Sequence, residues 1–164
     1  MQESCEKDII SREGFTAAAA PLERLLLTVG YSILHSWDAA ADAVQSALLR
    51  AWRNRRSIRN VDSFKPWLVK IVINESKNMA RRGFMTELSD TAAETPADPV
   101  EKIDVQYAVD HLPLKYRLPI ILFYYDDMSV ADISEVLDKP RGTVISLLHR
   151  GREQLRKELK DYGK

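Results

Sequence analysis

The stretch that most constrains the fold is Ser129–Leu155, with the sequence SVADISEVLDKPRGTVISLLHRGREQL. Ser129 and Asp132 have the spacing of a capping box, so we expect a helix to begin there. Asp138 tolerates turn conformations, and Pro140 suits the first position of a new helix better than the end of an old one. The stretch therefore predicts two short helices joined by a tight turn.

The second of these helices has two unlike faces when its residues are placed about 100° apart. One side is apolar, and it contains Val144, Leu148, Gly151 and Leu155, with Leu147 at its edge. The opposite side contains Ser146, His149, Arg150 and Glu153. A helix–turn–helix needs this division, because one side packs on the partner helix and the other enters the DNA major groove. A surface hairpin with a solvated charged face is the alternative, but the order of cap, turn and basic residues is more specific.

Three stretches resemble one protein family. PRGTVISLLHRGREQLRKEL (140–159) resembles the promoter-binding helix–turn–helix of bacterial RNA polymerase sigma factors of the extracytoplasmic-function (ECF, sigma-70-like) type. DAVQSALLRAWRN (42–54) resembles the family helix that binds the β′ coiled coil of the polymerase. SFKPWLVKIVINESKN (63–78) resembles the stretch that binds and helps to open the −10 element. Three landmarks in the right order rarely arise by chance.

The distribution of charge along the chain favours a nucleic-acid partner, although the total numbers of basic and acidic residues do not. The 24 basic and 24 acidic residues give a formal net charge of zero. Residues 45–83 nevertheless contain ten Arg or Lys and two acids, and residues 139–160 contain seven Arg or Lys and two acids. Residues 84–104 contain six acids and one Lys. Two basic blocks separated by an acidic one predict two surfaces for a polyanion and a linker that stays off it.

The fold class expected is all-α, with two small helical domains joined by an acidic flexible linker. Residues 1–83 are expected to form a sigma-2-like domain, residues 84–100 the linker, and residues 101–164 a sigma-4-like helix–turn–helix domain. In the first domain we expect a helix over 15–34, in which either the alanines 17–20 form a separate turn or the helix bends at Pro21. Two further helices are expected over 39–53, capped by Asp38, and over 64–82, capped by Asp62 or Ser63. The apolar side of the helix over 39–53 is predicted to contain Ala41, Val44, Leu48, Ala51 and Trp52.

Two helices should precede the helix–turn–helix in the second domain. The first begins at Glu101, and the second runs from Pro113 to Tyr125. Pro119 should kink this second helix or delay its start, because proline cannot donate a hydrogen bond to the residue four positions earlier.

The helix expected over 64–82 has a single polar stripe. Its members lie at helical spacing and include basic and amide side chains without an acid: Lys70, Asn74, Lys77, Asn78 and Arg81. Solvated faces usually mix Glu with Lys. Lys and Arg suit phosphates and Asn suits base edges, so the stripe favours contact with nucleic acid.

The resemblance implies a sigma factor that directs core RNA polymerase to specific promoters and helps to open the −10 DNA. The polymerase-binding residues implied are Asp42, Gln45, Leu49 and Arg53. Those implied at the −10 element are Arg59, Asn60, Phe64, Lys70, Asn74, Lys77, Asn78 and Arg81. Those implied at the −35 element are Arg141, Thr143, Ile145, Ser146, His149, Arg150 and Arg152. The implied partners are core polymerase (through its β′ coiled coil and β flap), promoter DNA and an anti-sigma factor.

Some residues depart from the family pattern. Ser46 stands where the family usually has Glu, and Asp138 replaces the usual turn Gly. Ile145 and Leu147 stand where Lys or Arg is frequent, which predicts a −35 contact that is weaker or differently specific. Ile145 could contact a thymine methyl group.

Several classes of protein are disfavoured. One cysteine, Cys5, excludes an internal disulfide and suggests a reducing compartment. The three histidines are too scattered for a metal site, no apolar run approaches the ~20 residues of a membrane span, and the N-terminus lacks a signal-peptide pattern. We expect a cytoplasmic protein with no membrane insertion, cofactor, metal or small-molecule substrate.

Three other functions are alternatives to the sigma-factor interpretation. A stand-alone helix–turn–helix regulator would need a dimer to bind paired half-sites, and no zipper is visible. A small helical enzyme is disfavoured, because no phosphate-binding Gly loop, metal cluster or nucleophile elbow is present. An adaptor that binds polymerase without its own promoter specificity stays possible, given the loss of basic residues at 145 and 147.

Overall fold

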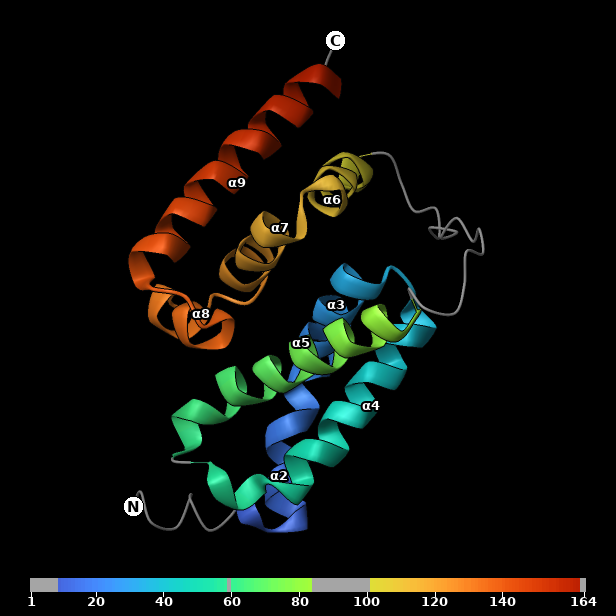
Figure 1. Ribbon diagram of the computed structural model, residues 1–164, viewed down its shortest axis with the longest axis vertical. Helices are drawn as coiled ribbons and strands as arrows, with labels where there is room; N and C mark the ends of the chain where they lie inside the picture. Colours follow the sequence, from blue (N-terminus) through green and yellow to red (C-terminus); the bar gives the residue numbers. More distant parts are fainter. Residues whose placement is uncertain (1–8, 59, 84–100, 163–164) are drawn as a thin grey trace. The chain divides into compact units, whose positions relative to one another are not determined.

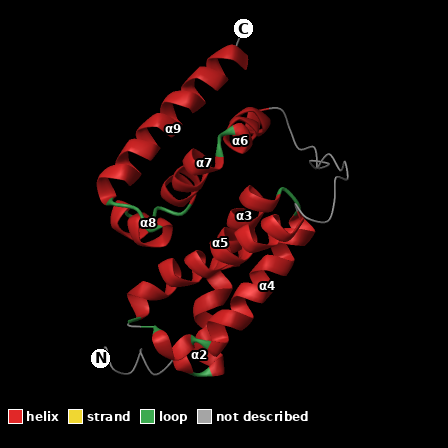
Figure 2. Ribbon diagram, viewed as in Figure 1, coloured by secondary structure: helices red, strands yellow, loops and turns green. Residues whose placement is uncertain are grey.

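The computed structural model describes residues 9–58, 60–83 and 101–162, apart from the side chains of 101–104 and 162. The chain forms two compact units, Met1–Ser89 and Asp90–Lys164, and each is described by itself. The regular elements in the described ranges are helices (Figure 2), so the predicted all-α class is confirmed. The predicted linker, residues 84–100, lies outside the described residues, as does Arg59.

The first unit is built from three long helices that pack on one another. These are α3 (Glu23–Leu34), α4 (Trp37–Arg53) and α5 (Phe64–Gly83), and α2 (Arg12–Ala19) precedes them (Figure 1). Three 3₁₀ turns complete the unit: η1 (Ala20–Leu22), η2 (Arg55–Ser57) and η3 (Val61–Ser63). Leu26, Val29 and Leu68 are fully buried in its core.

The first unit begins and ends its helices in ways that only partly match the sequence prediction. The predicted interruption near Pro21 is confirmed: the alanines 17–19 end a separate helix, α2, and η1 separates it from α3. The predicted cap Asp38 is wrong: the Ser36 hydroxyl accepts a hydrogen bond from the Ala39 amide at 3.2 Å, and α4 begins at Trp37. Asn60 caps η3, the turn before α5, where its side-chain oxygen accepts from the Ser63 amide at 2.8 Å. Ser63, one of the two predicted caps of α5, directly precedes its first residue.

The buried face of α4 is shifted by one residue from the predicted one. Ala40, Ala43 and Ala47 are fully buried together with Ala51, whereas Ala41 and Leu48 are only half-buried. Small side chains on this face let α4 approach its neighbours closely. The prediction followed the larger apolar residues of α4 and therefore missed this face.

The segment Arg12–Leu34 is long and apolar enough to cross a membrane by length and composition alone, since it contains an 18-residue window with a mean hydropathy of 1.2. This corrects the expectation that no such run exists. The core helix of a soluble protein passes the same test. Here η1 interrupts the segment, Glu23 and Arg24 are exposed in its middle, and Leu26 and Val29 are buried in the helical core. These features favour a core helix.

The crossing of α3 and α4 depends on Gly30. A Cβ atom added there would lie 3.2 Å from the Ala40 Cβ and 3.3 Å from its Cα. The neighbouring backbone is part of this contact and can move little, so a larger side chain should push the two helices apart.

We expect Gly30→Leu to destabilise the first unit by roughly 1–3 kcal/mol, the usual cost of overpacking a core. Denaturant unfolding would measure the change. Gly83→Leu is the matched control, because no described atom lies within 4 Å of a Cβ added at Gly83. Equal unfolding midpoints for the two variants would contradict the close crossing.

The second unit contains α6 (Glu101–His111), α7 (Leu114–Ile120), the π-helical turn η4 (Ile121–Tyr125), α8 (Val130–Leu137) and α9 (Arg141–Tyr162). Helix α9 packs on α6, α7 and α8. Pro119 lies buried inside α7, which begins at Leu114, so the alternative of a delayed start is wrong. The chain instead changes to π-type hydrogen bonding directly after the proline.

The predicted helix–turn–helix is confirmed as α8, a tight turn and α9. The Ser129 hydroxyl accepts from the Asp132 amide at 3.1 Å, and Asp138 ends α8 with a left-handed φ of 52°. Val144 then donates to the Pro140 carbonyl at 3.1 Å as α9 starts. Val144 and Leu148 are buried, and the opposite side of α9 is exposed, as the helical periodicity predicts.

Candidate nucleic-acid and polymerase interfaces

The exposed face of α9 is the candidate duplex-binding surface. Each of the residues implied at the −35 element is exposed: Arg141, Thr143, Ile145, Ser146, His149, Arg150 and Arg152. The Ser146 hydroxyl donates to the Gly142 carbonyl at 3.1 Å, which leaves its oxygen able to accept from a base. His149 lies 3.5 Å from the Glu153 carboxylate, an ion pair when the imidazole is protonated. Ile145 is 55% exposed, an unusual position for an isoleucine.

Whereas Ser146 and His149 have partners within α9, the side chain of Arg152 makes a hydrogen bond to a residue outside this helix. Its Nη1 donates to the Tyr124 hydroxyl at 3.1 Å, which draws the guanidinium toward η4. Arg152 also lines a groove on that side of α9. Its predicted role at DNA is therefore less direct than that of Arg150.

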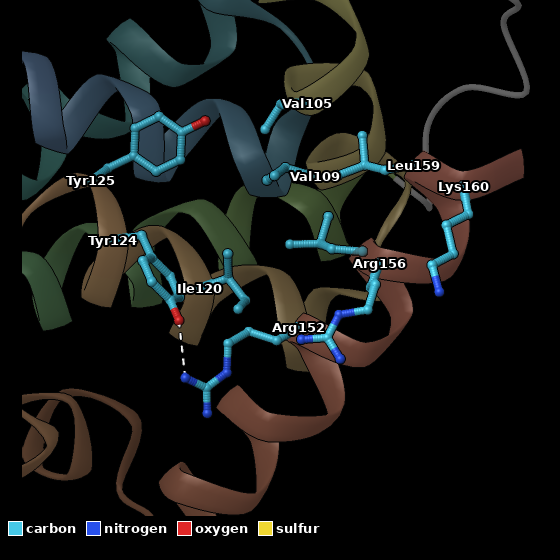
Figure 3. Close-up of a pocket in the computed structure, with 10 residues that line it drawn as sticks. Val105, Val109, Ile120, Tyr124, Tyr125, Arg152, Arg156, Leu159 and Lys160 are labelled. Carbon is cyan, nitrogen blue, oxygen red and sulfur yellow. Dashed lines mark hydrogen bonds between the residues drawn. The ribbon is translucent and has the colours of Figure 1, made fainter. Parts of the chain in front are cut away.

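That groove has an apolar floor and a basic edge (Figure 3). Its volume is about 680 Å³, and it lies among α6, the α7–η4 segment and α9. The apolar lining includes Val109, Ile120 and Leu159, and the polar edge includes Arg156 and Lys160. In Figure 3 the hydroxyl of Tyr124 meets the Arg152 guanidinium at one end. The helical pattern of the sequence did not predict this groove, because its residues come from elements that are distant in the chain.

The junction of α6 and α7 is fixed by a buried arginine. Arg117 donates from Nε and Nη2 to the Leu112 carbonyl at 3.1 and 2.7 Å, which satisfies the end of α6. Burial lowers the pKa of the Arg117 guanidinium, and the nearby Asp110 carboxylate opposes that shift. Arg117 therefore has a structural role beside the groove.

The polar stripe of α5 is the candidate −10 surface. Asn74 and Arg81 are exposed, and Lys70, Lys77 and Asn78 are half-buried. Glu75 neighbours the stripe, but its carboxylate lies 2.9 Å from the Arg50 guanidinium of α4. This acid of α5 is thus paired with a cation, and the stripe itself is basic and amide-rich.

Two residues implied at the −10 element have structural contacts instead. Phe64 is 3% exposed, and its ring centroid lies 5.6 Å from that of Phe15. Phe64 therefore occupies a core position in the first unit, and its implied DNA contact stays a prediction. Asn60 is exposed, but its side-chain oxygen accepts from both the amide and the hydroxyl of Ser63, at 2.8 and 2.6 Å. Asn60 thereby shapes the turn before α5.

The residues implied in polymerase binding share one exposed strip of α4: Asp42, Gln45, Leu49 and Arg53. Leu49 is 58% exposed, so its apolar side chain is accessible to a partner. Gln45 also borders a groove of about 420 Å³ lined by Leu26, Leu27 and Val44 among others. In the part of the chain that the structure describes, no group of three or more His, Cys, Asp or Glu residues could bind a metal ion.

Comparisons with known proteins agree with this geometry. Residues 19–83 match the Sigma-70 region 2 family, and residues 102–155 match the Sigma-70 region 4 family. A chain with both regions is a sigma factor of the sigma-70 class, a non-enzymatic transcription initiation factor.

Two relatives identify the family within the sigma-70 class. The chain is 33% identical over 151 residues to the ECF RNA polymerase sigma factor SigW of Bacillus subtilis (strain 168), covering 80% of this chain and 81% of that one. It is 29% identical over 135 residues to the ECF RNA polymerase sigma-E factor of Escherichia coli (strain K12), covering 70% of each. The chain belongs to the ECF family of RNA polymerase sigma factors, and it directs RNA polymerase to promoters.

Solved structures share the fold. The sigma factor RpoE of Bartonella quintana, in a co-crystal with the anti-sigma factor NepR, gives a TM-score of 0.76 at 27% identity, covering 89% of this chain and 96% of that one. CnrH, solved with the cytosolic domain of CnrY, gives a TM-score of 0.72 at 18% identity, a likeness of fold alone.

Proposed function

We propose that each unit of this sigma factor contacts a different promoter element. The first unit binds core polymerase through α4 and captures unpaired −10 DNA on α5, while α9 contacts the −35 duplex. The observation that carries the proposal is the exposed Asn74 within a basic stripe. A protein that binds duplex DNA only through its helix–turn–helix has no use for such an amide group on a separate unit. Capturing an unpaired base shifts the duplex toward opening, since only the open form supplies that contact.

The −35 contact of this proposal rests on Ser146, His149 and Arg150. Arginine suits guanine edges and phosphates, and the exposed Ile145 suits a thymine methyl group. Because Ile145 replaces a cation frequent in the family, we expect a smaller electrostatic share of the affinity and hence a shallower salt dependence.

The remaining partners are proposed from surface chemistry and relatives. The groove beside α9, apolar with a basic edge, suits the β flap of the polymerase. The RpoE–NepR co-crystal supports an anti-sigma factor as a further partner. A reducing, cytoplasmic location is consistent with the single Cys5 and with the cytosolic CnrY domain bound by CnrH.

Run-off transcription with purified core polymerase and a promoter library tests the proposal. We expect transcripts from a subset of promoters that share −35 and −10 sequences. DNA binding without transcripts would favour the stand-alone regulator, and polymerase binding without promoter preference would favour the adaptor.

We predict that the double variant Asp42→Arg, Gln45→Ala weakens the complex with core polymerase in the absence of DNA. Both side chains are exposed on α4 and contribute nothing to the core, so folding should be unaffected. Co-purification and a titration of core polymerase would measure the loss.

Asp62→Arg is the matched control, since it makes the same charge change at an exposed position outside the α4 strip. It should bind polymerase like the parent. Wild-type recovery of the Asp42, Gln45 double variant would refute the α4 assignment.

A further inference from the structure

The described part of the loop that joins α4 to α5, residues 54–58 and 60–63, is connected to the N-terminal segment by Arg55. The Arg55 Nε donates to the Ile10 carbonyl at 2.8 Å, and its Nη1 donates to the Trp52 carbonyl at 2.8 Å. The guanidinium carbon also lies 3.7 Å from the centroid of the Trp52 ring, a cation–π contact. One side chain therefore joins the N-terminal segment, the last turn of α4 and the start of the loop.

The ring of Phe15 makes a second connection to the same loop. Phe15 lies on α2, and its centroid is 5.3 Å from that of Trp52, edge to face. On its other side it is 5.6 Å from the centroid of Phe64, again edge to face. Trp52 precedes the loop and Phe64 follows it, so the two ends of the loop contact one buried ring.

These contacts are more specific than hydrophobic burial requires. Arg55 is only half-buried, and two of its N–H groups point at main-chain carbonyls, which do not move with side-chain rotamers. Planar guanidinium geometry, and not charge alone, makes this double contact possible. Ile9, next to the carbonyl that Arg55 binds, is 6% exposed, so the N-terminal segment is itself anchored.

We propose that Arg55 and Phe15 form a brace that holds the α4–α5 loop in the conformation needed to open the −10 DNA. Arg55 is a positioning residue in this proposal, which rests on the proposed function of α5. The loop leads directly into α5 and its polar stripe. A loop that is ordered in advance need not be ordered when the DNA binds, so the brace raises the yield of open complex.

The brace also accounts for the buried Phe64. Its ring packs on Phe15 and, with centroids 6.1 Å apart, on Trp67. In this proposal Phe64 stabilises the loop by packing in the core of the first unit and does not contact DNA. The start of α5 is thereby fixed by α2, an element that contains none of the predicted DNA-contact residues.

Arg55→Lys tests the brace in the full chain assembled with core polymerase. Lysine keeps the positive charge but cannot make the planar pair of hydrogen bonds. We expect open-complex formation, measured by permanganate reactivity of unpaired thymines, to fall roughly tenfold, as for loss of a charge-assisted hydrogen bond. Affinity for core polymerase should match that of the parent, because Arg55 lies in η2 and not in the exposed strip of α4.

Arg56→Lys is the matched control, since Arg56 is the exposed neighbour in the same turn. It should open promoters like the parent. Phe15→Leu provides a second perturbation that keeps an apolar side chain in the core. If Arg55 and Phe15 act as a unit, the double variant should lose little more than the worse single variant.

The outcomes separate the brace from the proposed function. If the parent opens promoters and Arg55→Lys opens them equally well, the brace is overturned and the function of α5 stands. An equal fall in polymerase affinity would also overturn the brace, since it would indicate general damage to the unit. Failure of the parent to open any promoter would overturn the proposed function and the brace with it.

Discussion

Replacing Asn74 and Asn78 with alanine is expected to lower open-complex formation by roughly ten- to a hundredfold, the loss of one good base contact. Lys70, Lys77 and Arg81 stay in place, so electrostatic attraction to the DNA backbone should persist. Closed-complex formation should therefore match the parent, and the defect should lie in the step that unpairs the −10 DNA. Permanganate reactivity of thymines in the presence of core polymerase measures that step.

A template with a pre-melted −10 bubble is the control for this variant. It removes the cost of unpairing, so the deficit should shrink on it if the amides help to open DNA. Normal opening of a fully paired promoter by the Asn74, Asn78 double variant would mean that α5 is not the −10 surface.

The helix–turn–helix could be predicted from sequence because its determinants are local. Ser129 caps a residue three positions away, and Asp138 and Pro140 mark the turn within a few residues. Each signal acts over less than one helical turn, so no knowledge of the tertiary fold is needed. The exposed face of α9 then follows from helical periodicity alone.

The role of Phe64 could not be predicted in the same way. The family resemblance implied a DNA contact for Phe64, whereas its burial depends on Phe15, which is 49 positions earlier in the sequence. The cap of α4 was also mispredicted, because Ser36 and Asp38 are both good N-cap residues. The choice of Ser36 lengthens α4 so that Trp37 can stack on Tyr31 with centroids 4.2 Å apart.

Arg55 shows most clearly which contacts cannot be predicted from the sequence. It is one of several arginines between positions 50 and 59, and the carbonyl it binds is 45 residues away. The local sequence pattern that points to this role is the spacing of three residues between Trp52 and Arg55. That spacing suits a cation–π pair on one helical face, but many residue pairs in a protein have it. Distant main-chain contacts of this kind leave almost no pattern in a single sequence.

Arg150→Ala should weaken binding of the polymerase complex to −35 duplexes by ~1–3 kcal/mol if the side chain contacts a base, and should relax sequence preference at that base pair. Arg150 is exposed on the side of α9 opposite the buried Val144 and Leu148, which is the geometry of a groove-facing residue. Affinities for a set of duplexes with single changes in the −35 element, at fixed salt, would measure both effects.

Arg156→Ala is the matched control for loss of one arginine from α9. Arg156 lies at the groove edge beside Lys160, on a different side of the helix from Arg150. It should leave −35 sequence preference unchanged. If Arg150→Ala weakens binding equally on every duplex and makes the salt dependence shallower, Arg150 contacts phosphate only. Unchanged affinity on all duplexes would refute a groove-facing α9, because an arginine in the groove should contact either a base or a phosphate.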